Sequence, residues 1–171
     1  MDAWRIMTYD FELGAVRADV LVRSDDGYPI AIIEIEARHD LTRVGAMTLR
    51  RRVLGQDLIR EVAYFLLLSQ NTSYLWKGEQ SLNEPPMYEF LMSKVLARYL
   101  PKTDLKEDME RTRFQLAVFQ WMIDSTRTQL DTMEEPDRIL VSSGFLASIS
   151  GALILTEALI ARQKTMLYAH L

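Results

Sequence analysis

Residues 18–37 read ADVLVRSDDGYPIAIIEIEA, and this stretch decides the fold of the first half of the chain. Its two flanks, 18–23 and 30–37, are rich in aliphatic and β-branched side chains, which favour extended structure. Between them, Asp-Asp-Gly at positions 25–27 has the chemistry of a tight turn, because glycine adopts the positive φ angle that such turns require. The stretch therefore predicts an antiparallel hairpin.

The residues around this hairpin predict one helix and three more strands. Residues 41–62 repeat apolar side chains at helical spacing and predict a helix. Residues 63–69 (AYFLLLS) are almost wholly apolar, as in a strand buried on both faces, and residues 73–77 (SYLWK) predict another strand. Upstream of the hairpin, residues 4–8 predict a short first strand.

The second half of the chain predicts helices. Pro85 and Pro86 open one that Pro101 stops, since proline is tolerated in the first turn of a helix but not in its interior. An amphipathic helix follows over residues 104–133, and a last one over residues 139–167. The predicted fold class is α/β, with a mixed central sheet of about five strands (β-β-β-α-β-β) followed by a C-terminal subdomain of about three helices.

The length of 171 residues is that of one domain, or of one domain with an appendage. We divide the chain into a core over residues 1–80 and a helical extension over 81–171, which packs on the core or mediates oligomerisation. Residues 139–156 carry no charge, but their four serines and two glycines favour a buried helix over a membrane span. The first residues lack the pattern of a signal peptide, so we expect no membrane partner.

Composition excludes several classes of function. The chain contains no cysteine, which excludes disulfide scaffolds, cysteine-ligated zinc and thiol nucleophiles, and fits a reducing, cytoplasmic location. The net charge is −4, so contact with nucleic acid requires a local basic patch. Arginine accounts for 15 of the 20 basic residues, a bias that suits bidentate contacts to phosphate or carboxylate.

Three carboxylates are expected to meet at one end of the hairpin. Glu34 and Glu36 are two positions apart on a strand, so their side chains share a face, and tight pairing of the hairpin places Asp19 beside them. Like charges this close repel one another unless solvent or a cation relieves them. Mg²⁺ (or Mn²⁺) takes oxygen ligands of this kind, activates water and neutralises charge on a phosphate. The alternative is a strand with one wet face, on which charges alternate without any function.

A basic segment follows the acidic strand. Residues 38–60 contain six arginines and two aspartates, which give a local net charge of +4. Clustered arginines neutralise phosphates, so this segment predicts a surface that binds DNA without sequence preference. The alternative is a solvated helix face, or ion pairs with the acidic C-terminal half. The candidates for binding nucleic acid are Arg43, Arg50, Arg51 and Arg52.

The order of these motifs resembles the PD-(D/E)XK nuclease superfamily, whose members share the restriction-endonuclease-like fold. The resemblance covers residues 4–77 and lies in the hairpin with Asp19 and Glu34, the helix after it and the two strands that follow. It implies that Asp19 and Glu34 are metal ligands and that the backbone carbonyl of Ile35 completes the metal site. It also implies hydrolysis of phosphodiester bonds.

The chain departs from the family's pattern at three points. Glu36 stands where the family usually has a lysine that orients or stabilises the attacking water. Some restriction enzymes similarly have glutamate there and are active, with the acid as an extra ligand or general base, whereas many relatives without the lysine are inactive. Ala18 replaces the proline that usually precedes the aspartate, and the helix that usually precedes the first strand is missing. Arg38, two residues beyond Glu36 on the same face, is the candidate for a positive charge near the scissile phosphate.

These observations favour a metal-dependent nuclease domain that hydrolyses DNA within a defence or recombination system. Its catalytic candidates are Asp19, Glu34, Glu36 and Arg38. Two alternatives stay open. One is a catalytically inactive module of the same fold that binds nucleic acid or a protein partner. The other is a structural module that forms a homo-oligomer, or joins a larger complex, through its C-terminal helices.

Overall fold

The computed structural model describes residues 18–55, 62–100, 109–125 and 134–156, with side chains as far as Ala152 in the last range. The strand predicted at residues 4–8 lies outside these ranges. So do parts of the predicted helices, among them residues 56–61 and 157–167.

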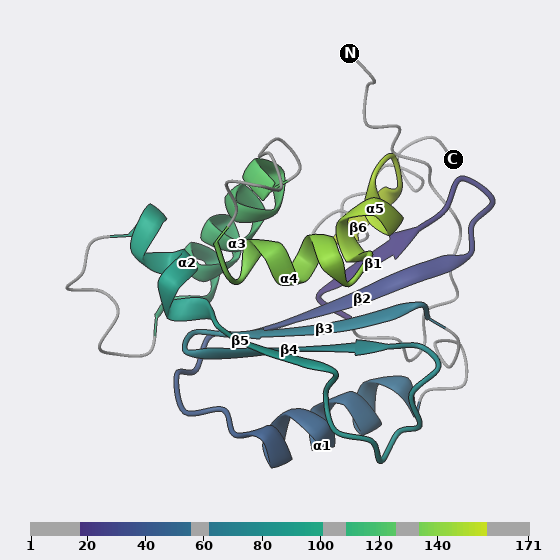
Figure 1. Cartoon of the computed structure of the whole chain (residues 1–171), viewed down its shortest axis with the longest axis horizontal. Helices are drawn as coiled ribbons and strands as arrows, with labels where there is room; N and C mark the ends of the chain where they lie inside the picture. The colour runs from purple at the N-terminus through teal and green to yellow at the C-terminus, as the bar shows by residue number, and fades with distance from the viewer. Residues whose placement is uncertain (1–17, 56–61, 101–108, 126–133, 157–171) are drawn as a thin grey trace, which may run out of the picture.

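A six-stranded mixed sheet forms the centre of the molecule, in the order β5-β4-β3-β2-β1-β6 (Figure 1). Its strands are β1 (Val20–Arg23), β2 (Pro29–Glu36), β3 (Tyr64–Ser69), β4 (Thr72–Lys77), β5 (Tyr88–Leu91) and β6 (Leu153–Thr156). β2 and β3 are parallel, and every other neighbouring pair is antiparallel. The predicted α/β class with a mixed sheet is confirmed, and strands from both sides of residue 80 join the same sheet.

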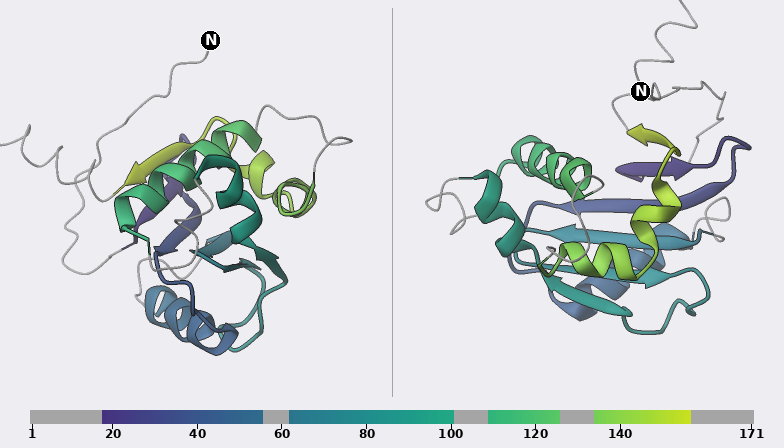
Figure 2. Two further views of the ribbon diagram at one scale, coloured as in Figure 1. Left: turned by 90° about the vertical axis from the view of Figure 1, so that its left-hand side faces the viewer. Right: turned by 45° about the horizontal axis from the view of Figure 1, so that its top comes forward.

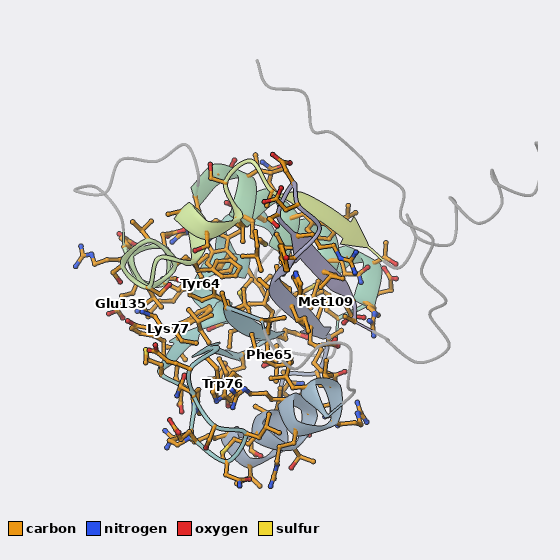
Figure 3. The ribbon with its side chains drawn as sticks, turned by 90° about the vertical axis from the view of Figure 1, so that its right-hand side faces the viewer. Tyr64, Phe65, Trp76, Lys77, Met109 and Glu135 are labelled. Carbon is orange, nitrogen blue, oxygen red and sulfur yellow. The ribbon has the colours of Figure 1, made fainter. Side chains whose placement is uncertain are left out.

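Helices cover both faces of this sheet (Figure 2). They are α1 (Arg43–Leu54), α2 (Met92–Tyr99), α3 (Arg111–Ser125), α4 (Asp137–Ser142) and α5 (Phe145–Ile149). α1 covers one face, and α2 to α5 cover the other. Because side chains alternate along a strand, Phe65 and Trp76 pack on the side of α1, whereas Tyr64 points to the opposite side (Figure 3).

The hairpin of β1 and β2 forms as predicted. Val20 pairs with Ile33 and Leu21 with Ile32, and Gly27 in the turn has a φ of 84°. The backbone N–H of Gly27 donates to the carbonyl of Ser24 at 2.9 Å, which closes the turn. β2 then continues to the parallel pairing with β3, in which Glu36 lies opposite Ser69.

α1 begins close to the carboxyl end of β2 and runs back beneath the sheet (Figure 1). Thr42 is its N-cap, because the Oγ1 of Thr42 accepts a hydrogen bond from the N–H of Gly45 at 3.2 Å. The inward stripe of α1 consists of Ala46, Arg50, Val53 and Leu54, which recur at helical spacing. The helix predicted over residues 41–62 is confirmed from 43 to 54.

Two of the predicted helices in the second half are wrong in part. The segment after Pro85 and Pro86 first forms β5, which pairs with β4, and only then α2. The segment predicted as one helix over 139–167 forms α4 and α5 and then β6. Its glycines have positive φ angles of 82° at Gly144 and 73° at Gly151, which interrupt the helix. β6 then pairs with the open edge of β1, which satisfies the backbone groups of β1 that face this edge.

In the described ranges, no helix combines the length and the apolar character needed to cross a membrane.

Of the amphipathic helix predicted over residues 104–133, the structure describes α3, which spans 111–125. Its inward residues include Phe114 and Trp121, both of which are fully buried. These large side chains fix α3 against the sheet, and with it the residues at the start of the helix.

Candidate metal and nucleic-acid site

The structure brings Asp19 and Glu34 together. Antiparallel pairing of Val20 with Ile33 places Asp19 opposite Glu34, at the start of β1 and near the end of β2. The backbone N–H of Asp19 donates to Glu34 Oε1 at 3.3 Å, and the backbone N–H of Ile35 donates to Asp19 Oδ2 at 2.7 Å. The two carboxyl groups are therefore held side by side by main-chain donors, at the carboxyl end of the parallel β2–β3 pair.

The environment of this acidic pair raises the pKa of Glu34 to about 8. Burial is the main cause, and the neighbouring charge of Asp19 is the second. The backbone N–H of Asp19 and the charge of Arg111 act in the opposite direction without outweighing them. Glu34 is therefore a much weaker acid than an ordinary glutamate, because burial and the neighbouring carboxylate both disfavour its charged form.

An arginine from the C-terminal half completes the surroundings of the pair. Arg111, the first residue of α3, forms an ion pair with Asp19 Oδ1. The start of α3 is held beside the strand ends because the backbone N–H of Met109 donates to Oε1 of Gln70 at 2.9 Å, and Gln70 directly follows β3. Sequence reasoning missed Arg111, since it lies 92 positions from Asp19 and no local motif marks it.

Glu36 does not join the acidic pair. Its carboxylate Oε2 lies 3.2 Å from Nε of Arg38 in an ion pair at the surface. In the residues that the structure describes, no group of three or more histidine, cysteine, aspartate or glutamate side chains is placed to hold a metal ion. The expected trio is therefore reduced to a pair, because Glu36 lies about 7 Å further along β2 than Glu34 and has a cation of its own.

The same contact changes the interpretation of Arg38. The guanidinium of Arg38 is directed to Glu36, and the backbone carbonyl of Arg38 accepts a hydrogen bond from the N–H of Gln70 at 3.1 Å. Its role next to a phosphate stays a prediction. Ile35 is buried in the core, and its N–H is bonded to Asp19, while the role of its carbonyl as a metal ligand stays a prediction.

Arg50 is not a surface residue, so its prediction as a DNA contact is wrong. It is only 2% exposed and lies on the inward stripe of α1. Its Nη1 and Nη2 donate to the carbonyls of Ser81 and Gln80 at 2.7 and 3.0 Å, and its Cζ lies 5.3 Å from the ring centre of Trp76. Burial lowers the pKa of Arg50. The residue clamps the loop after β4 onto α1.

The other three arginines of α1 are exposed. Arg43 forms an ion pair with Glu89 of β5, and hydrogen bonding to Glu89 raises the pKa of Arg43. Arg51 and Arg52 lie in the last turn of the helix, where Nη2 of Arg51 donates to Oγ1 of Thr48 at 3.4 Å. The last turn lies about 13 Å along the helix from its start, so these two cations are at the far end of α1, on the side of the molecule remote from the acidic pair.

A cavity of about 170 Å³ lies at that remote side, lined in part by Arg50, Phe65 and Lys77. The acidic pair and this cavity are thus separate places in the molecule.

Comparisons of the chain with protein-family models, with curated proteins and with solved structures found no match. The chemistry of the acidic pair therefore rests on its own residues.

Proposed function

We propose that this chain is a divalent-cation-dependent nuclease domain that hydrolyses phosphodiester bonds in DNA. The observation that carries the proposal is the pairing of Asp19 with Glu34 by main-chain hydrogen bonds on adjacent strands. A further support comes from the order of the elements. The hairpin, the helix α1 and the parallel strand β3 follow one another as in the resemblance to the PD-(D/E)XK superfamily.

The donor set fits a hard divalent cation. Mg²⁺ is usually held by one or two carboxylates together with waters and a substrate phosphate, and Asp19 and Glu34 supply the two carboxylates. The backbone carbonyl of Ile35 is the further oxygen that the resemblance implies. A half-buried glutamic acid whose pKa is raised beside an aspartate is also a site that gains from an added positive charge. A bound ion would supply activation of water and neutralisation of the charge that develops on the phosphate.

The protein's own groups have separate tasks in this proposal. Asp19 and Glu34 would hold the cation through their carboxylate oxygens. Glu36, two residues along the same strand and paired with Arg38 at the surface, would be the general base that activates the attacking water. Arg51 and Arg52 contact backbone phosphates further along a duplex.

A second candidate is a catalytically inactive module that binds nucleic acid or a protein partner. The ion pair of Glu36 with Arg38 favours it, because this pair occupies the position of the family's lysine with a neutral unit. A structural role is the third candidate. Leu116 on α3 is 65% exposed, which is consistent with contact to another chain through the C-terminal helices. The absence of cysteine fits a cytoplasmic location for any of the three.

Nicking of supercoiled plasmid DNA tests the proposal. We expect cleavage in Mg²⁺ or Mn²⁺, none in EDTA, and a loss of about 100-fold or more in Asp19→Asn and in Glu34→Gln. Asp25→Asn, in the exposed turn of the same hairpin, is the matched control and should cleave like the parent. DNA binding that is sensitive to salt, without cleavage, would select the inactive module. Neither cleavage nor binding, with oligomers that grow with concentration, would select the structural role.

A further inference from the structure

The start of α3 places a positive charge where the acidic strand lacks one. Arg111 reaches Asp19 from the opposite half of the chain, and its side chain is 50% exposed while that of Asp19 is 10% exposed. The guanidinium therefore bridges the buried acidic pair and the solvent. Two residues after Glu34, where the family has its lysine, this chain has Glu36. The positively charged side chain beside the acidic pair therefore comes from α3 and not from the strand.

The backbone that carries Arg111 is fixed by contacts on both sides. Met109 is tied to Gln70 by the hydrogen bond described above, and Phe114 is fully buried in the core. The carboxylate of Glu110 accepts from the backbone N–H groups of Thr112 and Arg113 at 3.1 and 3.3 Å, which caps the first turn of the helix. Movement of the Arg111 guanidinium thus requires rotation of its side chain only.

A divalent cation at Asp19 competes with this guanidinium. Asp19 Oδ2 accepts from the N–H of Ile35, and Oδ1 is paired with Arg111, so a cation on Oδ1 would meet a like charge at contact distance. Repulsion would then move the guanidinium away from Asp19. Because the backbone of Arg111 is fixed at the start of α3, the guanidinium would stay close to the cation. Arginine's planar fork matches two oxygens of a phosphate, which is the group that arrives there in the proposed reaction.

We propose that Arg111 is a phosphate-binding residue of this site: it pairs with Asp19 while the cation is absent and transfers to a backbone phosphate of the nucleic acid when the cation binds. This inference rests on the proposed function. It has two consequences that can be measured apart from cleavage. Arg111 should weaken binding of the free cation, and it should strengthen binding of DNA only when the cation is present.

Calorimetric titration of the full chain with Mn²⁺ alone tests the first consequence. We expect Arg111→Gln to bind Mn²⁺ about tenfold more tightly than the parent, because the competing charge is gone. Arg113→Gln, which removes the same charge two positions along α3, is the matched control and should keep the parent's affinity. Arg111→Lys retains the charge and should also stay within about threefold of the parent. Thermal melting checks that each variant is folded.

Fluorescence anisotropy with a short labelled duplex, in EDTA and in Ca²⁺, tests the second consequence. The gain in DNA affinity on adding the cation should fall about tenfold in Arg111→Gln, and Arg111→Lys should also lose part of it, since an ammonium ion lacks the bidentate fork. Parent-like values for Arg111→Gln in both titrations would overturn the inference and leave the metal site standing. No binding of Mn²⁺ by the parent would overturn the proposed function itself.

Discussion

One buried and one half-buried carboxyl group of this molecule stand in opposite situations. Asp137, at the start of α4, accepts hydrogen bonds from Nε1 of Trp121 at 2.6 Å and from Oγ of Ser125 at 3.0 Å, and forms an ion pair with Arg98 at 2.6 Å. Burial alone would raise the pKa of Asp137, but the hydrogen bonds from Arg98, Trp121 and Ser125 outweigh it and hold the pKa below its usual value. Its charge is fully compensated within the protein.

Glu34 is the contrasting case. Burial raises its pKa to about 8, the neighbouring Asp19 adds to that shift, and the one main-chain donor that it receives is long, at 3.3 Å. A carboxylate with a complete set of donors stabilises the packing of α2, α3 and α4, whereas the incompletely compensated carboxyl group of Glu34 is where the proposed cation would bind.

The largest effect is expected at the compensated carboxylate. Asp137→Ala should lower the free energy of unfolding by about 3–5 kcal/mol, because it leaves Arg98 and two buried donors without their acceptor. Urea denaturation at pH 7 measures it. The folded pKa of Asp137 lies below the unfolded one, so its contribution is present above about pH 4 and is lost as the pH falls. Asp25→Ala in the exposed turn should change stability by less than about 0.5 kcal/mol. A loss of free energy of unfolding as small as that in Asp137→Ala would contradict the conclusion that the hydrogen bonds of Asp137 stabilise the packing of the helices.

A smaller effect of opposite sign is expected at the acidic pair. The folded pKa of Glu34 is raised, so in EDTA the folded protein binds more protons than the unfolded chain between about pH 4.5 and 8. The parent should therefore lose stability, on the order of a few kcal/mol, as the pH rises through this window. Glu34→Gln should remove most of this dependence and be more stable than the parent at pH 8. Thermal melting from pH 5 to 9 measures both; parallel profiles would contradict the assignment.

The smallest changes in stability are expected among the arginines of α1, where they distinguish the buried Arg50 from the exposed Arg51 and Arg52. Nε of Arg50 is buried without a hydrogen-bond partner in the described part of the chain, so Arg50 is an incompletely compensated group with a structural role. Arg50→Met should cost about 1–3 kcal/mol of stability through the lost bonds to Ser81 and Gln80. Arg51→Gln with Arg52→Gln should stay within about 0.5 kcal/mol.

DNA binding should depend on the same arginines in the opposite order, with a large contribution from Arg51 and Arg52 and none from Arg50. The slope of log affinity against log salt should fall by about 2 in the Arg51→Gln, Arg52→Gln double variant and stay unchanged in Arg50→Met. A loss of the slope in folded Arg50→Met would contradict its assignment to the core.

Local patterns predicted a large part of the fold. The turn at 25–27 and the alternation along 30–37 were enough for the hairpin and for the approach of Asp19 to Glu34, whereas the register, with its shift between Val22 and Arg23, is seen only in the structure. The helical spacing in α1 also contained the signal for Arg50, because Ala46, Arg50 and Val53 fall on one stripe. That signal was outweighed by the assignment of Arg50, together with Arg43, Arg51 and Arg52, to a surface that binds nucleic acid.

Local patterns along the chain are sufficient for the hairpin, α1, and the strands β3 and β4, because their turns and periodicities depend on neighbours only a few residues away. The tertiary structure alone decided that β6 joins β1, that Arg50 is buried beneath the loop after β4, and that Arg111 meets Asp19. Each of these joins segments at least 30 positions apart, and such contacts depend on how whole faces of the sheet are covered. The spacing of residues within one segment does not indicate which distant segment will pack against it.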